Sequence, residues 1–472
     1  MFDLIVAVDS KNGIGLFDGV NYSIPWSVEV DTRFFMDMTS CGKENVIIMG
    51  RNTFLSLGSK PLAGRINVVV SSNHIEGVPT CRSLNAALEK CQAFGHDNVF
   101  VIGGRQLYQE ALRHPLLRYA YVTRIDHDFG CNISLELGNL KLLGSKMFML
   151  WEKRVGERVR VCFNKYGGGT NLCVENLEEL NYLNILEELM SVPGRATRNA
   201  NTFSKFGKQI EFSLRDGTFP MLTTKKLSLK IIVEELLFFL RGETNTLKLS
   251  EKGIKIWEPN TSREFLDRLG LKNYGVGDMG PMYGYQFRHF NAPYGSCDMD
   301  HEGKGVDQLR ICLELLKNDP TSRRILMTAF NPSQMYEGVL HPCHGIVIQF
   351  YVERGKYLCC SMYQRSADIF LGFPINIASY SLLTYIMCEL VNNDKEYHGE
   401  LLEPGKVVIS LGDYHLYESH YEPAARQILR NPKPFPKLRI KRKLAQINHY
   451  TLDDFELIDY NAMPTIKAEM IA

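Results

Sequence analysis

Residues 340–366 read LHPCHGIVIQFYVERGKYLCCSMYQRS, and this stretch decides how the second half of the chain folds. Two apolar runs flank Arg354 and Gly355, which predicts two β-strands joined by a tight turn. Cys343 stands between a proline and a histidine just ahead of the first run. Such a thiol is either a buried packing residue at a strand entrance or a nucleophile, and packing is the commoner outcome. Its polar surroundings must decide between the two.

Three nearby segments carry the polar groups that a nucleotide needs. They are SRRILM at 322–327, MYQRSADIFLGFPINIASY at 362–380 and GDYHLY at 412–417. Arginines pair bidentately with phosphate oxygens, and Asn, Asp, His and Tyr suit a planar base with carbonyl and imide edges. A thiolate also gains from nearby positive charge. The polar residues concerned are Arg323, Arg324, Gln364, Arg365, Ser366, Asp368, Asn376, Asp413, His415 and Tyr417.

The composition is that of a globular chain with more than one domain. The 472 residues are 45% hydrophobic and 23% charged, which predicts two or three domains and no large disordered part. The net charge of +1 gives no global support for a nucleic-acid or membrane partner. The twelve cysteines are scattered, without the spacing of a zinc or redox site, so we expect reduced thiols and no metal.

The location follows from the apolar segments. MFDLIVAVDS has no basic region typical of a signal peptide, and stretches such as LKIIVEELLFFL carry charges and are shorter than a membrane span. We therefore expect a soluble, cytoplasmic protein.

The pattern of apolar residues along the chain changes near residue 165. Before it, the runs LIVAV, NVIIMG, INVVVSS, NVFVIGG and YAYVTRI alternate with helical patterns, which predicts an α/β domain with a mostly parallel central sheet. Gly167 to Gly169 mark a break, and longer helical patterns mixed with strands follow, including an apolar helix at LKIIVEELLFFL. We expect an α/β domain at 1–165, a junction at 166–182 and a different, α+β domain at 183–472.

Two glycine-containing strand ends and one acid distinguish the first half. VIGGRQLY and MGRNTF each follow an apolar run and open a helix, which suits a pyrophosphate, and Arg51 could hold the extra phosphate of NADPH. The alternatives are a simple tight turn and a solvated surface arginine. Asp31 follows Trp26 on a helix with one apolar face, where desolvation raises a carboxyl pKa. An ordinary solvated helix acid is the competing reading.

Five motifs in order resemble dihydrofolate reductase over residues 1–160: NGIG at 12–15, IPW at 24–26, MGRNTF at 49–54, PLAGR at 61–65 and VIGG at 101–104. The resemblance implies that Asp31 is the active-site acid, contacting the pteridine and assisting protonation during hydride transfer. The implied folate residues are Ala7, Ile14, Trp26, Asp31, Phe35, Leu57, Arg65 and Thr123, with Arg65 on the glutamate carboxylate. The implied NADPH residues are Ala7, Ile14, Gly15, Arg51, Asn52, Thr53, Ser71, Ser72, Gly103 and Gly104. CNISLELGNLKLLGSK at 131–146 does not clearly match the family's final strands.

The second half closely resembles thymidylate synthase over residues 183–472. Besides the segments around Cys343, it carries TTKK at 223–226, VEELLFFLRGETN at 233–245, GPMYGYQFR at 280–288 and IKAEMIA at 466–472. The resemblance implies that Cys343 adds to C6 of dUMP, so that C5 captures the methylene unit of 5,10-methylenetetrahydrofolate. The implied catalytic residues are Cys343, Glu235, Asn376 and Tyr283. The implied dUMP residues are Arg198, Arg323, Arg324, His344, Gln364, Arg365, Ser366, Asp368, Asn376, His415 and Tyr417, and the implied folate residues are Lys225, Trp257 and Asp368.

One phosphate loop departs from the synthase family. The usual Arg-Thr-Gly-Thr-Gly-Thr is replaced by RATRNANTFSKFG at 195–207, where the arginine position falls on Thr197. Either Arg198 or Arg195 could take its place, and we expect Arg198. The resemblance further implies a homodimer through the synthase half, in which Arg323 and Arg324 reach the partner's site, and C-terminal residues that close over the loaded site.

The order of the two halves is similar to that of the bifunctional dihydrofolate reductase–thymidylate synthase family. The dihydrofolate that the second half produces is the substrate of the first. Two rival hypotheses stay open. One is a synthase with a non-catalytic reductase-like domain, against which the presence of Asp31, Trp26 and Arg65 argues. The other is a nucleotide- or RNA-binding regulator, which would not need the nucleophile Cys343.

Overall fold

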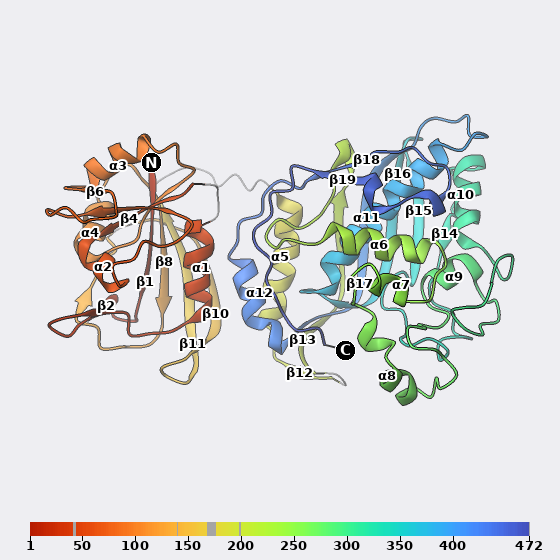
Figure 1. Ribbon diagram of the computed structural model, residues 1–472, viewed down its shortest axis with the longest axis horizontal. Helices are drawn as coiled ribbons and strands as arrows, with labels where there is room; N and C mark the ends of the chain where they lie inside the picture. Colours follow the sequence, from red (N-terminus) through yellow and green to blue (C-terminus); the bar gives the residue numbers. More distant parts are fainter. Residues whose placement is uncertain (41–43, 139, 168–175, 198–199, 472) are drawn as a thin grey trace. The chain divides into compact units, whose positions relative to one another are not determined.

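The computed structural model describes residues 1–40, 44–138, 140–167, 176–197 and 200–471. The chain divides into two compact units, Met1–Cys173 with Ala425–Asn431 and Val174–Ala424 with Pro432–Ala472. Each unit has its own large central sheet (Figure 1).

The first unit is built on an eight-stranded sheet with the order β10-β11-β8-β1-β7-β4-β5-β6. All contacts among β1, β4, β5, β6, β7 and β8 are parallel, whereas β11 pairs antiparallel with both β8 and β10. The five predicted apolar runs form strands of this sheet, so the mostly parallel α/β fold is confirmed. The strands are β1 (Phe2–Val8), β4 (Val46–Gly50), β5 (Ile66–Val70), β6 (Thr80–Cys81), β7 (Val99–Val101), β8 (Leu117–Ile125), β10 (Leu142–Glu152) and β11 (Glu157–Gly167).

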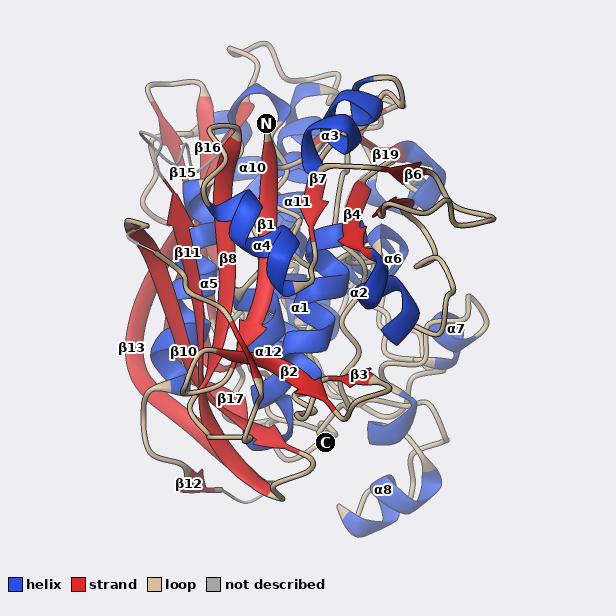
Figure 2. Cartoon of the chain, turned by 90° about the vertical axis from the view of Figure 1, so that its left-hand side faces the viewer, coloured by secondary structure: helices blue, strands red, loops and turns tan. Residues whose placement is uncertain are grey.

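Helices connect the parallel strands and cover the buried Val and Ile side chains of the sheet. They are α1 (Glu29–Ser40), α2 (Arg51–Ser56), α3 (Leu84–Gln92) and α4 (Arg105–Leu112). Three short strands, β2 (Gly13–Phe17), β3 (Tyr22–Ser23) and β9 (Ile133–Ser134), form a separate small sheet in the order β3-β2-β9. Figure 2 shows β2 crossing below the end of β1, with the short β3 beside the tip of β2.

The closing edge of the first sheet is a long antiparallel hairpin, β10–β11, that the sequence analysis did not predict. Gly167 ends β11, and a Cβ atom there would meet the Arg118 carbonyl oxygen at 2.9 Å, so only glycine fits. Gly168 and Gly169, which we took as part of the junction, lie outside the described residues.

The second unit is built on a six-stranded sheet with the order β12-β13-β17-β16-β15-β14. The predicted hairpin is confirmed, because β15 and β16 pair antiparallel and the turn residues Arg354 (φ 55°) and Gly355 (φ 71°) both adopt positive φ. β16 and β17 pair in parallel. The strands are β12 (Arg195–Ala196), β13 (Asn201–Ser213), β14 (Leu326–Met327), β15 (Val347–Glu353), β16 (Tyr357–Asp368) and β17 (Glu403–Tyr417), with a separate pair β18 (Lys437–Ile440) and β19 (Phe455–Ile458).

Two apolar helices form much of the core of this unit. α6 (Leu229–Leu240) is buried as predicted. α11 (Gly372–Asn392) packs on β16 and β17. By length and composition alone α11 could cross a membrane, which corrects our view that the apolar segments were too short, but 78% of its most apolar window is buried inside the protein. It is therefore a core helix.

The remaining helical segments include one long helix with a buried face, Leu177–Met190, and several shorter ones, of which Tyr421–Ile428 is divided between the two units. The α-helices are α5 (Leu177–Met190), α7 (Leu247–Ser250), α8 (Arg263–Arg268), α9 (Gly284–His289), α10 (Gln308–Asn318) and α12 (Tyr421–Ile428). The 3-10 turns are η1 (Arg215–Gly217), η2 (Glu258–Asn260), η3 (Glu418–His420), η4 (Ile447–His449) and η5 (Leu452–Asp454).

Candidate active sites

A cavity of about 1200 Å³ opens in the first unit where parallel strands end. Its walls include the carboxyl ends of β4, β5 and β7, which is where parallel α/β sheets bind ligands. The cavity brings together twelve of the residues predicted from the sequence. They are Ala7, Ile14, Gly15, Trp26, Arg51, Asn52, Thr53, Leu57, Ser71, Ser72, Gly103 and Gly104.

One wall of the cavity suits a phosphate group. Gly103 has φ 126°, and a Cβ atom there would lie 3.1 Å from the Thr53 hydroxyl, so a side chain would not fit. Helix α4 begins next to this turn, and its N-cap Gly104 leaves the first N–H groups without a side-chain partner. Arg51, Arg82 and Arg105 line the same cavity. The cavity therefore offers N–H groups at the start of α4 and positive charge to an anion.

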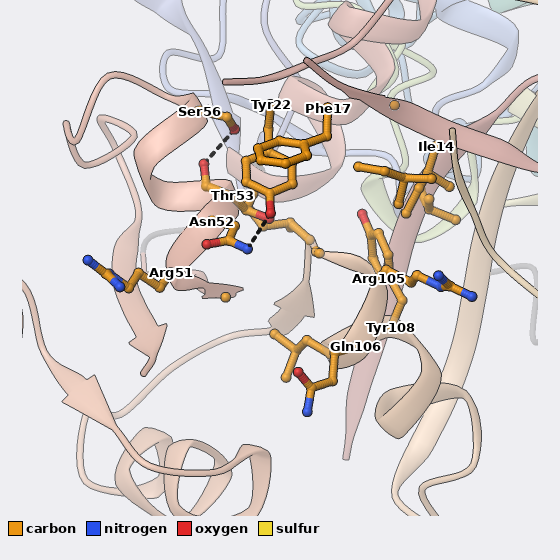
Figure 3. A pocket seen from close by; sticks show the side chains of 18 of the residues that line it. Ile14, Phe17, Tyr22, Arg51, Asn52, Thr53, Ser56, Arg105, Gln106 and Tyr108 are labelled. Atoms are coloured by element: carbon orange, nitrogen blue, oxygen red, sulfur yellow. Dashed lines mark hydrogen bonds between the residues drawn. The ribbon is translucent and has the colours of Figure 1, made fainter. Parts of the chain in front are cut away.

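An aromatic pair from the β2–β3 hairpin lines the cavity. Phe17 and Tyr22 stack with their ring centroids 4.5 Å apart. The Asn52 amide donates to the Tyr22 hydroxyl at 3.0 Å, which links α2 to the hairpin (Figure 3). Sequence reasoning expected Asn52 to face NADPH and missed Tyr22, because their contact joins two segments about thirty residues apart.

Asp31 lies in the first turn of α1 and is half-buried. Burial raises its pKa from 3.8 to about 6, while a hydrogen bond with Thr123 acts in the opposite direction. Tyr108, which lines the cavity, has its pKa raised mainly by burial and further by the charge of Asp31. Asp31 thus lies beside the cavity with a pKa suited to proton transfer near neutral pH.

Two other predicted folate residues, Phe35 and Arg65, lie on α1 or against its end and do not line the cavity. Phe35 is half-buried on α1. The Arg65 guanidinium donates to the Thr39 hydroxyl at 2.7 Å and to the Ala63 carbonyl at 3.1 Å, so it is held against the end of the helix. Trp26 is buried and packs against Phe129 at 5.5 Å between ring centroids.

Cys343 in the second unit is held by its backbone and approached by one cation. Its N–H donates to the Tyr283 hydroxyl at 3.0 Å. The Arg365 guanidinium lies 3.8 Å from Sγ and donates to the Pro342 and His341 carbonyls at 2.8 Å. Burial nevertheless raises the pKa of Cys343, and Arg365 opposes this only in part. The thiol therefore stays protonated at neutral pH, and its Sγ lies 3.7 Å from the His341 carbonyl oxygen.

His344 is a neutral neighbour of the thiol. Its ring stacks on Tyr283 with centroids 4.6 Å apart, and its Nδ1 contacts the Tyr380 hydroxyl at 2.8 Å. Burial lowers its pKa to about 4, so it carries no charge at neutral pH. Sequence reasoning missed Tyr380, although Tyr380 follows Asn376 by four residues and so shares its face of α11.

Glu235 on α6 is the titratable carboxyl of this site. Burial raises its pKa from 4.5 to about 7, and the Trp257 indole N–H donates to it at 2.8 Å, which works in the opposite direction. Trp257 also packs edge-on against Tyr283 with centroids 6.0 Å apart. The acid, the tyrosine and the thiol therefore form one connected cluster.

Comparison with known proteins identifies one enzyme family for each half of the chain. Residues 180–472 match the family model of thymidylate synthase, and residues 1–141 match that of dihydrofolate reductase. The bifunctional dihydrofolate reductase-thymidylate synthase of Paramecium tetraurelia is 38% identical over 478 residues, which cover 99% of this chain and 98% of that protein. Bifunctional dihydrofolate reductase-thymidylate synthase 2 of Arabidopsis thaliana is 37% identical, with 99% of this chain and 88% of that protein covered.

The chain belongs to the bifunctional dihydrofolate reductase–thymidylate synthase family. It combines a reductase that uses NADPH with a synthase that uses methylenetetrahydrofolate, as the family does. Similarity along 99% of the chain disfavours the alternative of a non-catalytic first half.

Most of the residues expected to bind the nucleotide lie in the C-terminal parts of β16 and β17, and Asn376 lies on α11. Gln364 and Asn376 are buried, and Gln364 Oε1 has no hydrogen-bond partner among the described residues. Asp368 accepts from the N–H groups of Phe370 and Leu371 at 3.0 and 3.1 Å. Further along, His415 contacts Asp413 at 2.8 Å and packs edge-on against Tyr417, and Ser366 is partly exposed.

Other predicted synthase residues are placed differently. Lys225, expected near the folate's anionic tail, is buried, and its ammonium group donates to the Phe370 carbonyl and lies 3.9 Å from that ring centroid. Arg323 and Arg324 are exposed in the loop before β14. Arg195 is exposed in β12, and Arg198 lies outside the described residues. Among the described residues, no group of three His, Cys, Asp or Glu side chains is arranged for a metal ion.

Proposed function

We propose that residues 183–472 methylate dUMP through Cys343 and that residues 1–165 reduce the resulting dihydrofolate through Asp31. The observation that carries the proposal is the cluster of Cys343, Tyr283 and Glu235. It joins a thiol that faces a guanidinium to a carboxyl with a pKa of about 7.

In the synthase reaction the Cys343 thiolate adds to C6 of dUMP, and C5 becomes the carbon nucleophile. Because burial raises the pKa of Cys343, ionisation must be assisted when dUMP binds. Arg365 supports this role from 3.8 Å, while His344 is neutral and acts as a neighbour rather than as the base. Glu235, with a pKa of about 7, holds the proton that moves to or from the uracil through ordered water. After C5 captures the methylene carbon, the C5 proton leaves, the folate transfers a hydride to that carbon and departs as dihydrofolate, and the C6–S bond breaks to release Cys343.

We assign the dUMP contacts by the chemistry of each group. Asn376 and the unpaired Oε1 of Gln364 face the polar edge of the base. His415 and Tyr417 hold the deoxyribose hydroxyl. Arg365, Ser366 and Arg198 bind phosphate, together with Arg323 and Arg324 of a partner subunit. For the folate, Trp257 packs on the pteridine ring, and Asp368 accepts a hydrogen bond from that ring. The Lys225 ammonium group packs against the Phe370 ring, 3.9 Å from its centroid.

The reductase cavity fits NADPH. The glycine turn at Gly103, the N–H groups at the start of α4 and the arginines that line the cavity suit the phosphates of a dinucleotide. NADPH supplies the hydride when bound. The protein's own part is to place Asp31 beside the pteridine, where a carboxyl with a pKa of about 6 delivers a proton. Thr123 orients that carboxyl, and Arg65 binds the folate carboxylate.

The homodimer is the second part of the proposal. β15 alternates exposed and buried residues, so one side of the sheet faces α11 and the other presents apolar groups. Val347, Tyr351 and Tyr363 are 43%, 62% and 37% exposed on that open side. The Arg323 carbonyl accepts from Gln349 of β15, which places the two arginines at the edge of the open side. A second copy packing there would bury the apolar groups and receive the arginines.

Two point variants test the division of labour. Cys343→Ser should abolish dTMP formation and leave dihydrofolate reduction unchanged, and Asp31→Asn should do the reverse.

A mixing experiment tests the dimer. A Cys343→Ser chain is mixed with a chain that carries both Arg323→Ala and Arg324→Ala, and each heterodimer that forms contains one complete synthase site. About a quarter of the wild-type synthase activity should return after exchange. No recovery would exclude shared sites. We also propose a cytoplasmic location, which cell fractionation tests.

A further inference from the structure

His420 lies on η3, directly after the strand that carries His415 and Tyr417. Its side chain is completely buried. Its ring packs against Phe370 and Tyr417, each with centroids 5.5 Å away. His420 therefore contacts both the segment that follows Asp368 and the strand that would hold the deoxyribose.

The same ring binds the C-terminal segment. Nε2 of His420 contacts the Glu469 backbone carbonyl at 2.7 Å. Because a carbonyl oxygen only accepts, Nε2 must carry the proton and donate. The segment leading to Glu469 runs beside the TTKK motif, where Met463 exchanges backbone hydrogen bonds with Thr223 and Lys226, and Ile466 is buried. His420 thus provides an anchor close to the end of the chain.

The other ring nitrogen, Nδ1, faces the carboxylate of Asp368, the residue proposed to contact the folate. Nδ1 lies 4.0 Å from Asp368 Oδ1, which is longer than a hydrogen bond, and it has no hydrogen-bond partner among the described residues. A buried nitrogen without a partner is unusual, because losing its water costs free energy. The Asp368 oxygen already accepts two backbone N–H groups, so the carboxylate is fixed in front of the ring.

We propose that His420 is a positioning residue that fastens the C-terminal segment to the folate-binding side of the synthase site. The inference rests on the proposed roles of Asp368 and of the closing C-terminal residues. Its Nε2–H holds the Glu469 carbonyl, and its ring holds the Asp368–Phe370 segment, so that docking of the chain end and the position of Asp368 depend on one side chain. Loss of the Nε2 donor should weaken binding of the folate and leave that of dUMP nearly unchanged.

A matched pair of variants separates this role from packing. In His420→Gln the amide can reach the place of Nε2 and donate to Glu469, whereas in His420→Asn it reaches only the place of Nδ1. His420→Asn should raise the KM for methylenetetrahydrofolate about tenfold, as expected for one lost buried hydrogen bond, and change the KM for dUMP less than twofold. His420→Gln should recover most of the loss. The reductase activity of the same chain measures how much protein is folded.

A second measurement follows the chain end directly. In the complex with dUMP and methylenetetrahydrofolate, carboxypeptidase should release C-terminal residues faster from His420→Asn than from wild type, with His420→Gln close to wild type. Removing residues 469–472 should raise the same KM, and His420→Asn should add nothing further in that background.

Three results would overturn the proposal. They are an unchanged folate KM and cleavage rate in His420→Asn, equal losses in the Asn and Gln variants for both substrates, and full additivity with the truncation. Asp368→Asn distinguishes this from failure of the proposed site, because an unchanged folate KM in that variant would refute the role of Asp368 itself.

Discussion

Replacing Trp257 with phenylalanine tests the electrostatics of the synthase site. The indole N–H donates to Glu235 at 2.8 Å and favours the ionised carboxylate, against the burial that raises its pKa to about 7. Phenylalanine keeps an aromatic ring near Phe239 and Tyr283 but removes the donor. The pKa of Glu235 should therefore rise further.

The size of the rise follows from the hydrogen bond that is lost. A hydrogen bond to a charged group contributes about 1.5–3 kcal/mol, and a pKa unit corresponds to about 1.36 kcal/mol. The pKa of Glu235 should thus move up by about 1–2 units. The inflection in the pH dependence of the synthase rate should move upward whether the protonated or the ionised form of Glu235 is active, because the inflection follows the pKa.

The assay is the pH dependence of synthase kcat/KM for wild type, Trp257→Phe and Glu235→Gln. Wild type should show an inflection near pH 7 that moves upward in Trp257→Phe and is absent in Glu235→Gln. Infrared difference spectra of the protonated carboxyl group report the same titration without turnover. The reductase inflection near pH 6, from Asp31, provides the control and should stay in place.

An inflection that stays near pH 7 or moves down in Trp257→Phe would refute this reasoning. A lower rate without a shift would mean that Trp257 acts through packing alone.

Three further predictions concern single side chains. Asp31→Asn should stabilise the first unit at high pH. Because the pKa of Asp31 is raised to about 6 in the folded state, its ionised carboxylate destabilises the fold, with no effect below about pH 4 and the full effect above about pH 6. Thermal unfolding should show that the variant gains up to roughly 3 kcal/mol in the free energy of unfolding at pH 8 and nothing at pH 4. Thr123→Val removes the hydrogen bond that lowers the pKa of Asp31, so the reductase inflection should move up by about half a unit or more, and an unchanged pH profile would contradict the contact. Tyr283→Phe deprives the Cys343 N–H of its acceptor, so synthase kcat should fall about tenfold with the reductase rate as control.

The strands of both sheets and the residues of the reductase cavity could be predicted where a local sequence pattern determines the structure. The Val- and Ile-rich runs predicted the parallel sheet, and motifs at strand ends meet at one edge, which is why twelve predicted residues line the reductase cavity. The β10–β11 hairpin was missed because Met147, Met149 and Trp151 are exposed while Phe148 and Leu150 are buried. With apolar residues on both sides, the alternation that signals a strand disappears.

Contacts between distant segments could not be predicted in this way. Tyr380 contacts His344 across 36 residues, and His420 contacts Glu469 across 49, without any local pattern that marks either residue. Burial of Lys225 under Phe370 likewise depends on packing between segments 145 residues apart. Family resemblance located the motifs, and the structure adds which side chains touch.

The most direct test of two linked activities is a coupled turnover measurement on the purified chain. Protein is supplied with dUMP and methylenetetrahydrofolate, with and without NADPH, and dTMP, dihydrofolate and tetrahydrofolate are quantified. We expect dTMP in both cases, with dihydrofolate accumulating without NADPH and converted to tetrahydrofolate with it. Dihydrofolate that accumulates despite NADPH, or absence of dTMP, would contradict the account.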